Sequence, residues 1–247
     1  MFFSESCSKN RATFFFYIVF MKILIVSATI AEIQPLLNSL GITVEKNKNY
    51  YHSRIASHEV SVLITGPGMV ATAFHLGEIN LQNFDFALNA GIAGSFTNDL
   101  AIGELVHITT DCFAELGADY GDNFIPLCKL EFATDLPDAI FNEQGEIVNP
   151  TTCGNPKLRE VKSVKGITVN TINGEAHRIE KIKRIFAPDT ESMEGAAFLY
   201  ACIKKKTPCF QLRTISNYIE PRNLNRWNIP FAIANLNRQL PEIISAF

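Results

Sequence analysis

The chain has 247 residues, of which 47% are hydrophobic and 19% are charged, and its formal net charge at pH 7 is −3. This composition is ordinary for a globular protein, and the length suits one large α/β domain or two small ones. The basic residues are scattered except for Lys204-Lys205-Lys206, which is placed to end a helix, so a nucleic-acid-binding surface is not expected. The six cysteines include no CxxC, and the five histidines form no HxxxH or HExxH. We therefore expect no disulfide framework, no metal site and no cofactor.

The first 20 residues differ from the rest of the chain. Residues 12–20 are apolar and follow Lys9 and Arg11, as in a short signal peptide, but cleavage near Ser27-Ala28 would destroy the strand that follows. The stretch is also too short for a membrane span. We expect residues 1–20 to be a disordered extension or the product of an upstream translation start. Residues 21–247 are then expected to form a single domain of a cytoplasmic protein.

From Lys22 onward, short apolar runs alternate with helical patterns, which is typical of an α/β fold. Gly41 is placed to end the first helix, and residues 43–56 are expected to pair antiparallel with the strand at 60–65. Residues 115–160 are rich in turn-forming residues and are interpreted as mostly loop with short strands. The predicted strands are 22–28, 60–65, 84–90, 104–110, 165–170 and 208–215. The predicted helices are 33–40, 69–82, 175–186, 194–205 and 230–245.

Two junctions in the first third of the chain have competing interpretations. Thr29 and Glu32 have the spacing of a capping box, but Glu32 would also lie at the mouth of the sheet, where its carboxylate could activate a water. From this segment alone, the cap is favoured. The segment Thr65-Gly66-Pro67-Gly68-Met69 lacks both the lysine of a phosphate loop and the third glycine of a dinucleotide fingerprint, so it is interpreted as a tight turn.

Three later segments also lie at strand ends. The small residues of Asn89–Ser95 suit either close approach of the backbone to a ligand or packing against a helix, and both interpretations stay open. Glu194 precedes an apolar helix, where its carboxylate can face the helix dipole or hold sugar hydroxyls. Arg213 lies within an apolar strand, and a buried guanidinium is rarely unpaired, so Glu32 or Glu194 is expected as its partner.

The segments VSATIAEI, TGPGMVATA, NAGIAGSF, ESMEGAA and RTISN occur in this order along the chain. Together they resemble the purine nucleoside phosphorylase and methylthioadenosine nucleosidase superfamily, from Met21 to about residue 240. The C-terminal run RTISN-YIEPRN-LNRWNIPFAIANLN, together with ESMEGAA, resembles the futalosine hydrolases. The resemblance implies a three-layer αβα sandwich around a mixed, twisted sheet, a nucleoside substrate and assembly into a homo-oligomer.

The resemblance also implies roles for individual residues. Glu32 matches the glutamate that activates the attacking water, and Arg213 matches the arginine near that water. Met193 and Glu194 match the pair that holds the ribose, and Gly94 falls in the glycine-rich loop beside sugar and base.

Three positions differ from the adenosine-type nucleosidase. Asn217 occupies the place of its catalytic aspartate, Ile92 stands where it has a serine, and Thr171 stands where it has a base-stacking phenylalanine. These differences favour a 6-oxopurine over adenine, although Asn217 could instead only cap the following turn. Ile172 and Ser216, which adjoin Thr171 and Asn217, complete this part of the predicted substrate-binding set.

The loop after Asn217 contains Arg222, Arg226 and Trp227. Two guanidiniums with an aromatic ring would suit the benzoate tail of futalosine, and Arg222 is assigned to substrate binding on this basis. A solvated loop anchored by a buried Trp227 is the alternative.

The expected reaction is hydrolysis of the N-glycosidic bond of futalosine, giving hypoxanthine and dehypoxanthinyl futalosine for menaquinone biosynthesis. Three alternatives stay open, namely a nucleoside phosphorylase, a methylthioadenosine-type nucleosidase and a non-catalytic nucleoside-binding protein. The phosphorylase is disfavoured because Glu32 would repel phosphate. The binding protein is disfavoured because it has little use for a water-activating carboxylate.

Overall fold

The computed structural model describes residues 20–131, 140–152, 154–221 and 223–247. The expected extension at residues 1–20 therefore lies outside the described residues apart from Phe20, and so does Arg222. In the described part of the chain, no helix has the length and hydropathy needed to cross a bilayer.

Strands and helices alternate as predicted, with bounds that differ by a few residues. The strands are β1 (Lys22–Ser27), β2 (Tyr50–Ile55), β3 (His58–Ile64), β4 (Phe86–Ser95), β5 (Leu105–Asp111), β6 (Gly117–Tyr120), β7 (Asn123–Pro126), β8 (Ile147–Val148), β9 (Lys162–Thr168), β10 (Thr190–Ser192) and β11 (Cys209–Tyr218). The helices are α1 (Ile30–Ser39), α2 (Met69–Glu78), α3 (Pro156–Glu160), α4 (Ala176–Phe186), α5 (Gly195–Lys204) and α6 (Ile229–Ser245). The short strand β10 and the short helix α3 were not predicted.

The main sheet is mixed, which confirms the α/β fold expected from the sequence. Its strands are ordered β10-β9-β5-β11-β4-β1-β3-β2, and β1 lies parallel to both β3 and β4. Strand β2 pairs antiparallel with β3, as predicted for the hairpin. Strand β10 also pairs antiparallel with β4, so β4, β11, β5, β9 and β10 close into a ring. This closure was not expected from the sequence.

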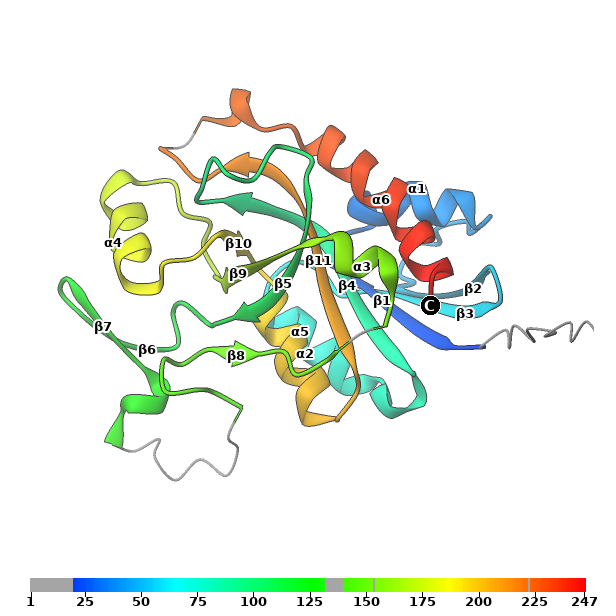
Figure 1. The fold of residues 1–247 in the computed structure, drawn as a ribbon, viewed down its shortest axis with the longest axis horizontal. Coiled ribbons are helices and arrows are strands. Elements are labelled where there is room, and N and C mark those ends of the chain that lie inside the picture. Colours follow the sequence, from blue (N-terminus) through cyan, green and yellow to red (C-terminus); the bar gives the residue numbers. More distant parts are fainter. Residues whose placement is uncertain (1–19, 132–139, 153, 222) are drawn as a thin grey trace, which may run out of the picture.

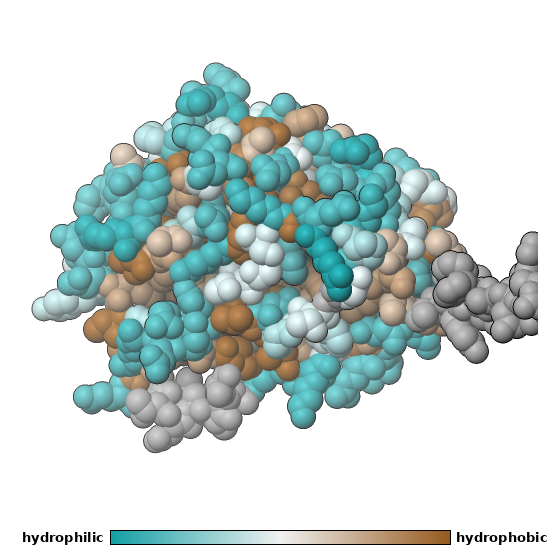
Figure 2. All heavy atoms as spheres, viewed as in Figure 1, coloured by the Kyte–Doolittle hydropathy of each residue, from teal (hydrophilic) through white to brown (hydrophobic). Residues whose placement is uncertain are grey.

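Helices cover both faces of the sheet around β1 (Figure 1). Successive side chains of a strand point to opposite faces. Accordingly, Ile23 and Ile25 pack with α1 and α6, whereas Leu24 and Val26 pack with α2 and α5. The surface face in Figure 2 is mostly hydrophilic, with smaller hydrophobic patches between polar residues.

Strand β4 changes partners along its length, and this change makes room for a site. Its first half pairs with β1 as far as Asn89, but β1 ends at Ser27, and β4 pairs with β10 only at Gly94 and Ser95. The backbone between Asn89 and Gly94 is thus free on that edge. Ligands of α/β proteins bind where neighbouring strands diverge in this way, because backbone groups are left without sheet partners.

Candidate active site

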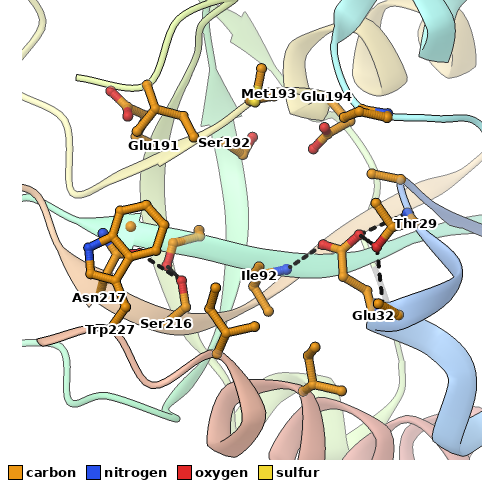
Figure 3. Close-up of a pocket in the computed structure, with 18 of the residues that line it drawn as sticks. Thr29, Glu32, Ile92, Glu191, Ser192, Met193, Glu194, Ser216, Asn217 and Trp227 are labelled. Atoms are coloured by element: carbon orange, nitrogen blue, oxygen red, sulfur yellow. Dashed lines mark hydrogen bonds between the residues drawn. The ribbon is translucent and has the colours of Figure 1, made fainter. Parts of the chain in front are cut away.

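A cavity of about 320 Å³ lies beside this free stretch of β4. In Figure 3, Glu32 lies at one end of the cavity and Asn217 and Trp227 lie at the other, while Glu191 and Glu194 belong to the opposite wall. The lining residues are Ala28, Thr29, Ala31, Glu32, Pro67, Ile92, Ala93, Gly94, Ile172, Glu191, Ser192, Met193, Glu194, Ser216, Asn217, Ile219, Trp227, Ile229 and Ile233.

Glu32 is held by three backbone and side-chain donors. The Thr29 N–H and hydroxyl donate to Oε2 at 2.9 Å each. The N–H of Glu32 donates back to the Thr29 hydroxyl oxygen at 3.3 Å, which completes the predicted capping box. The N–H of Ile92, on the free edge of β4, donates to Oε1 at 3.1 Å. Glu32 therefore belongs to the capping box of α1 and also places its carboxylate in the cavity wall. Its role in activating a water stays a prediction.

Burial raises the pKa of Glu32, and the nearby charge of Glu194 raises it further, whereas Arg213 and the donors at Ile92 and Thr29 lower it. The side chain is only 7% exposed, so loss of hydration is the largest cause. A carboxylate with a raised pKa is a stronger base than an ordinary glutamate, which suits proton abstraction near neutral pH.

Arg213 on β11 is fully buried behind this end of the cavity and does not line it. Its Nη2 lies 3.5 Å from Oε2 of Glu194 and donates to the side-chain carbonyl of Asn89. Glu194 is thus the carboxylate partner expected from the sequence. A Cβ on Gly91 would lie 2.2 Å from Nη1 of Arg213 and 2.8 Å from Oε1 of Glu32, so only glycine leaves room for both side chains.

Glu194 precedes α5 and faces the cavity from the opposite wall. Its Oε1 accepts a hydrogen bond of 3.0 Å from the N–H of Gly68, at the start of α2. Gly68 has φ +95°, a conformation that residues with a side chain rarely adopt. The glycine-rich turn, interpreted from the sequence as a tight turn only, therefore also orients a cavity carboxylate.

A buried polar cluster lies beneath the start of α5. Asp111 accepts hydrogen bonds of 3.0 Å from the side chains of Gln211 and Thr168, and the N–H of Ala196 donates to the Thr168 hydroxyl at 2.7 Å. Burial raises the pKa of Asp111 to about 6. This cluster ties the start of the helix that follows Glu194 to strands β5, β9 and β11.

The other end of the cavity is formed by a bulge in β11. The register between β11 and β4 shifts between Ile215 and Asn217, so Ser216 is an extra residue. Regular alternation would point adjacent residues to opposite faces, yet Ser216 and Asn217 both line the cavity. The Ser216 hydroxyl donates to Oδ1 of Asn217 at 2.8 Å, which orients the amide. A Cβ on Gly94 would lie 3.2 Å from Nδ2 of that amide.

Glu191 on β10 is a third carboxylate in the cavity wall. It is 4% exposed, and its oxygens accept hydrogen bonds from the backbone N–H of Asn173, at 3.0 Å, and from the Asn173 side-chain amide. Burial raises its pKa, although both Asn173 donors lower it. The segment Asn173-Gly174 thus supports a residue of the cavity.

The predicted site residues converge on this cavity with two exceptions. Arg213 lies behind it, and Arg222 lies outside the described residues. Arg226 forms a surface ion pair of 2.6 Å with Glu220, whereas Trp227 lines the cavity. The predicted residues that line the cavity are Glu32, Ile92, Gly94, Ile172, Met193, Glu194, Ser216 and Asn217.

Thr29, Pro67 and Glu191 also line the cavity, although they were not among the predicted site residues. The sequence did contain a signal for Glu191, because this glutamate lies only two residues before Met193, which was assigned to the site. The strand itself has only three residues, too few for a periodic pattern. The described residues contain no group of three or more histidine, cysteine, aspartate or glutamate side chains placed to hold a metal ion.

Residues 22–247 match the family model of the phosphorylase superfamily. The chain belongs to this superfamily. A futalosine hydrolase from Streptomyces coelicolor is 30% identical over 162 residues, which is 62% of each chain. An aminodeoxyfutalosine nucleosidase from Campylobacter jejuni is 29% identical over 208 residues, covering 80% of this chain and 86% of the relative.

Solved structures of the superfamily have the same fold. The native structure of futalosine hydrolase from Helicobacter pylori superposes with a TM-score of 0.73 at 20% identity, covering 92% of this chain and 98% of that one. A 5'-methylthioadenosine/S-adenosyl homocysteine nucleosidase from Campylobacter jejuni superposes with a TM-score of 0.69 at 25% identity, covering 91% and 97%. The arrangement of strands and helices in this superfamily member is therefore that of known nucleosidases.

Proposed function

We propose that this chain hydrolyses the N-glycosidic bond of futalosine, releasing hypoxanthine and dehypoxanthinyl futalosine for menaquinone biosynthesis. Relatives named futalosine hydrolase come from Streptomyces coelicolor, Acidothermus cellulolyticus and Thermus thermophilus, at 26–30% identity. The proposal covers one domain over residues 21–247, in the three-layer arrangement expected from the sequence. It describes a cytoplasmic homo-oligomer that uses no cofactor and binds neither nucleic acid nor membrane.

The charge of the cavity walls supports hydrolysis over phosphorolysis. Of the described residues that line the cavity, none is a lysine, arginine or histidine, whereas Glu32, Glu191 and Glu194 are carboxylates. Arg213 is the nearby cation, and it is already paired with Glu194. A phosphate nucleophile needs cationic or backbone N–H donors around its oxygens, and these carboxylates would repel it. Water carries no charge and is accepted by the same site.

Glu32 is the general base in this proposal. Three donors fix its carboxylate, and its raised pKa favours taking a proton from a water beside the anomeric carbon. The attacking water forms the new C1′–O bond as the C1′–N9 bond breaks, and the bond electrons leave with the purine. Positive charge builds on the ribose in the transition state, so a nearby carboxylate stabilises that state.

Glu194 and Met193 hold the ribose. The carboxylate of Glu194 is fixed by the Gly68 N–H and by Arg213, and it keeps acceptor capacity for the 2′- and 3′-hydroxyls. Hydrogen bonds to these hydroxyls accelerate the reaction if they tighten as the sugar ring flattens. Arg213 touches no substrate here and acts as a positioning residue for Glu194.

Asn217 stabilises the departing purine. Its Oδ1 accepts from Ser216, and its Nδ2 donates one amide hydrogen to the carbonyl of Tyr218. This leaves the other amide hydrogen for O6 of a 6-oxopurine and a second lone pair of Oδ1 for a protonated N7. The departing purine takes a proton at N7 from solvent water, and its N7–H can donate to Asn217 only after that, so this hydrogen bond favours the transition state. The loop containing Arg222, Arg226 and Trp227 receives the benzoate tail.

Hydrolysis of aminodeoxyfutalosine, called aminofutalosine below, is the second candidate. The aminodeoxyfutalosine nucleosidase from Campylobacter jejuni matches this chain over 86% of its own length. The test is product analysis of the purified protein given futalosine, aminofutalosine, methylthioadenosine and inosine, each with and without phosphate. We expect hypoxanthine from futalosine at a rate independent of phosphate. Faster adenine release from aminofutalosine would support the second candidate. Phosphate dependence would indicate a phosphorylase, and binding without turnover would indicate a nucleoside-binding protein.

A further inference from the structure

Glu191 occupies a position from which it can touch the base of a bound nucleoside. In the sheet register, Glu191 of β10 lies opposite Gly94 of β4, and Asn217 of β11 lies opposite the same glycine from the other side. Side chains that share a register point to the same face of a sheet. Figure 3 accordingly shows Glu191 on the wall across from Asn217, away from Glu32.

The spacing between these two side chains suits a flat heterocycle. Glu191 and Asn217 lie on the two neighbours of β4, so their backbones are separated by about two strand spacings, roughly 10 Å. Gly94 between them has no side chain to fill that width. A purine placed over Gly94 would present its N7/O6 side to Asn217 and another edge toward Glu191.

In the described part of the chain, no cation lies within ion-pair distance of Glu191, and Arg178, whose charge reaches it, is paired with Glu115. The donors that Glu191 receives are the two neutral N–H groups of Asn173. A carboxylate has about four acceptor positions, so two remain for a ligand. Asn173 is also 4% exposed, and its Oδ1 has no hydrogen-bond partner. A buried carboxylate without a direct ion-pair partner is costly to the fold, which is typical of groups retained for binding or catalysis.

We propose that Glu191 is a specificity-determining residue that accepts a hydrogen bond from the N1–H of a 6-oxopurine base. This inference rests on the proposed function for the presence of a purine in the cavity. A 6-oxopurine presents the donor N1–H beside the acceptor O6, and adenine presents the acceptor N1 beside a 6-amino donor. A carboxylate accepts only, so it binds the first edge and repels the second. Glu191 and Asn217 then read adjacent groups on one base.

The test measures the affinities of free bases, which do not require turnover. Dissociation constants for hypoxanthine and adenine are measured by calorimetry with the wild-type protein and with Glu191→Gln. The variant loses the charge but keeps the shape, and its amide can donate to N1 of adenine. We expect the preference for hypoxanthine over adenine to fall by about tenfold to a hundredfold, the worth of a charge-assisted hydrogen bond.

Two further measurements separate this role from support of the segment around Asn173. 1-Methylhypoxanthine, which lacks N1–H, should bind the wild-type protein at least about tenfold more weakly than hypoxanthine does. Glu115→Gln is the matched control, because Glu115 lies outside the cavity, paired with Arg178 at 2.8 Å, and its charge still reaches Glu191. This control should leave the base preference within about twofold of wild type.

An unchanged hypoxanthine preference in Glu191→Gln would overturn the inference, as would equal loss for both bases. If that variant does not fold, the 1-methylhypoxanthine comparison decides, and equal binding of the two bases by the wild-type protein overturns it. A wild-type protein that binds neither base overturns it as well. Failure to cleave futalosine, with the base preferences as expected, would contradict the proposed reaction and leave the role of Glu191 standing.

Discussion

The two ends of the cavity are built from different chemistry. At one end, the carboxylates of Glu32 and Glu194 are clamped by backbone N–H groups and lie beside the buried guanidinium of Arg213. At the other end, a neutral amide, Asn217, is oriented by a serine hydroxyl and lies near Trp227. The first end suits charge that develops on a sugar, and the second suits the flat face and polar edge of a base.

This difference separates two properties of the proposed enzyme. Changes at the Glu32 end should alter how fast the bond is broken, with the same factor for every substrate. Changes at the Asn217 end should alter which base is released. A variant that moved both properties together would show that the ends are not independent.

Glu32→Gln should have the largest effect, lowering kcat by about 10²- to 10⁴-fold, because a general base is lost. The factor should be equal for futalosine and inosine. The fold should persist, since the Gln carbonyl still accepts from Thr29 and only the hydrogen bond with Ile92 is lost, at a cost of about 1 kcal/mol. Steady-state kinetics measure the loss of kcat, and a thermal melt measures the stability of the fold. Near-normal turnover would remove the water-activating role.

Asn217→Asp should change the ratio of kcat/KM for futalosine over aminofutalosine, by about tenfold to a hundredfold toward aminofutalosine. A carboxylate repels O6 of hypoxanthine, whereas a protonated carboxyl donates to N7 of adenine and accepts from its amino group. Both substrates are assayed with both proteins. Asn217→Ser serves as a control that has neither the amide of the wild-type protein nor the carboxyl group of the Asp variant. A ratio that stays constant would show that Asn217 does not read the 6-position.

The pH profile should report Glu32. The base must be ionised, so kcat/KM should fall about tenfold per pH unit on the acid side of its pKa. Because burial raises that pKa, the acid limb should lie above the ordinary value of 4.5. The raised pKa also means that the fold binds the proton more tightly than the unfolded chain does. The contribution of protonated Glu32 to the free energy of unfolding is therefore complete below pH 4.5 and is lost as pH rises through the pKa of Glu32 in the folded protein. Glu32→Gln should lack this limb, and its persistence there would assign it to another group.

Removal of the loop cations should have the smallest effect and should depend on the substrate tail. Arg222→Ala should raise the KM for futalosine about tenfold and leave the KM for inosine, which lacks the benzoate, unchanged. Arg226→Ala should cost only about two- to threefold, because its guanidinium is already paired with Glu220 on the surface. KM values for the two substrates measure this. Equal losses on futalosine and inosine would contradict recognition of the tail by this loop.

Local patterns account for much of what the sequence predicted. The Thr29–Glu32 spacing predicts the helix start that the structure has, and the apolar run after Glu194 predicts α5. The lone charge of Arg213 in an apolar strand predicts a carboxylate partner, and Glu194 is that partner. The order of the motifs predicts which segments gather at one edge of the sheet. These features depend on residues a few positions apart or on one strong electrostatic requirement.

Long-range pairing decided the rest. The α/β alternation and the residues that end strands follow from local sequence, since hydrophobic periodicity and capping act within a few residues. Only the tertiary structure brought the Ile92 N–H to Glu32, because β4 must leave β1 before it meets β10. The same strand exchange closed the ring and placed Glu191 in the cavity wall. Partner choice between strands depends on contacts across the whole chain, and no local spacing encodes it.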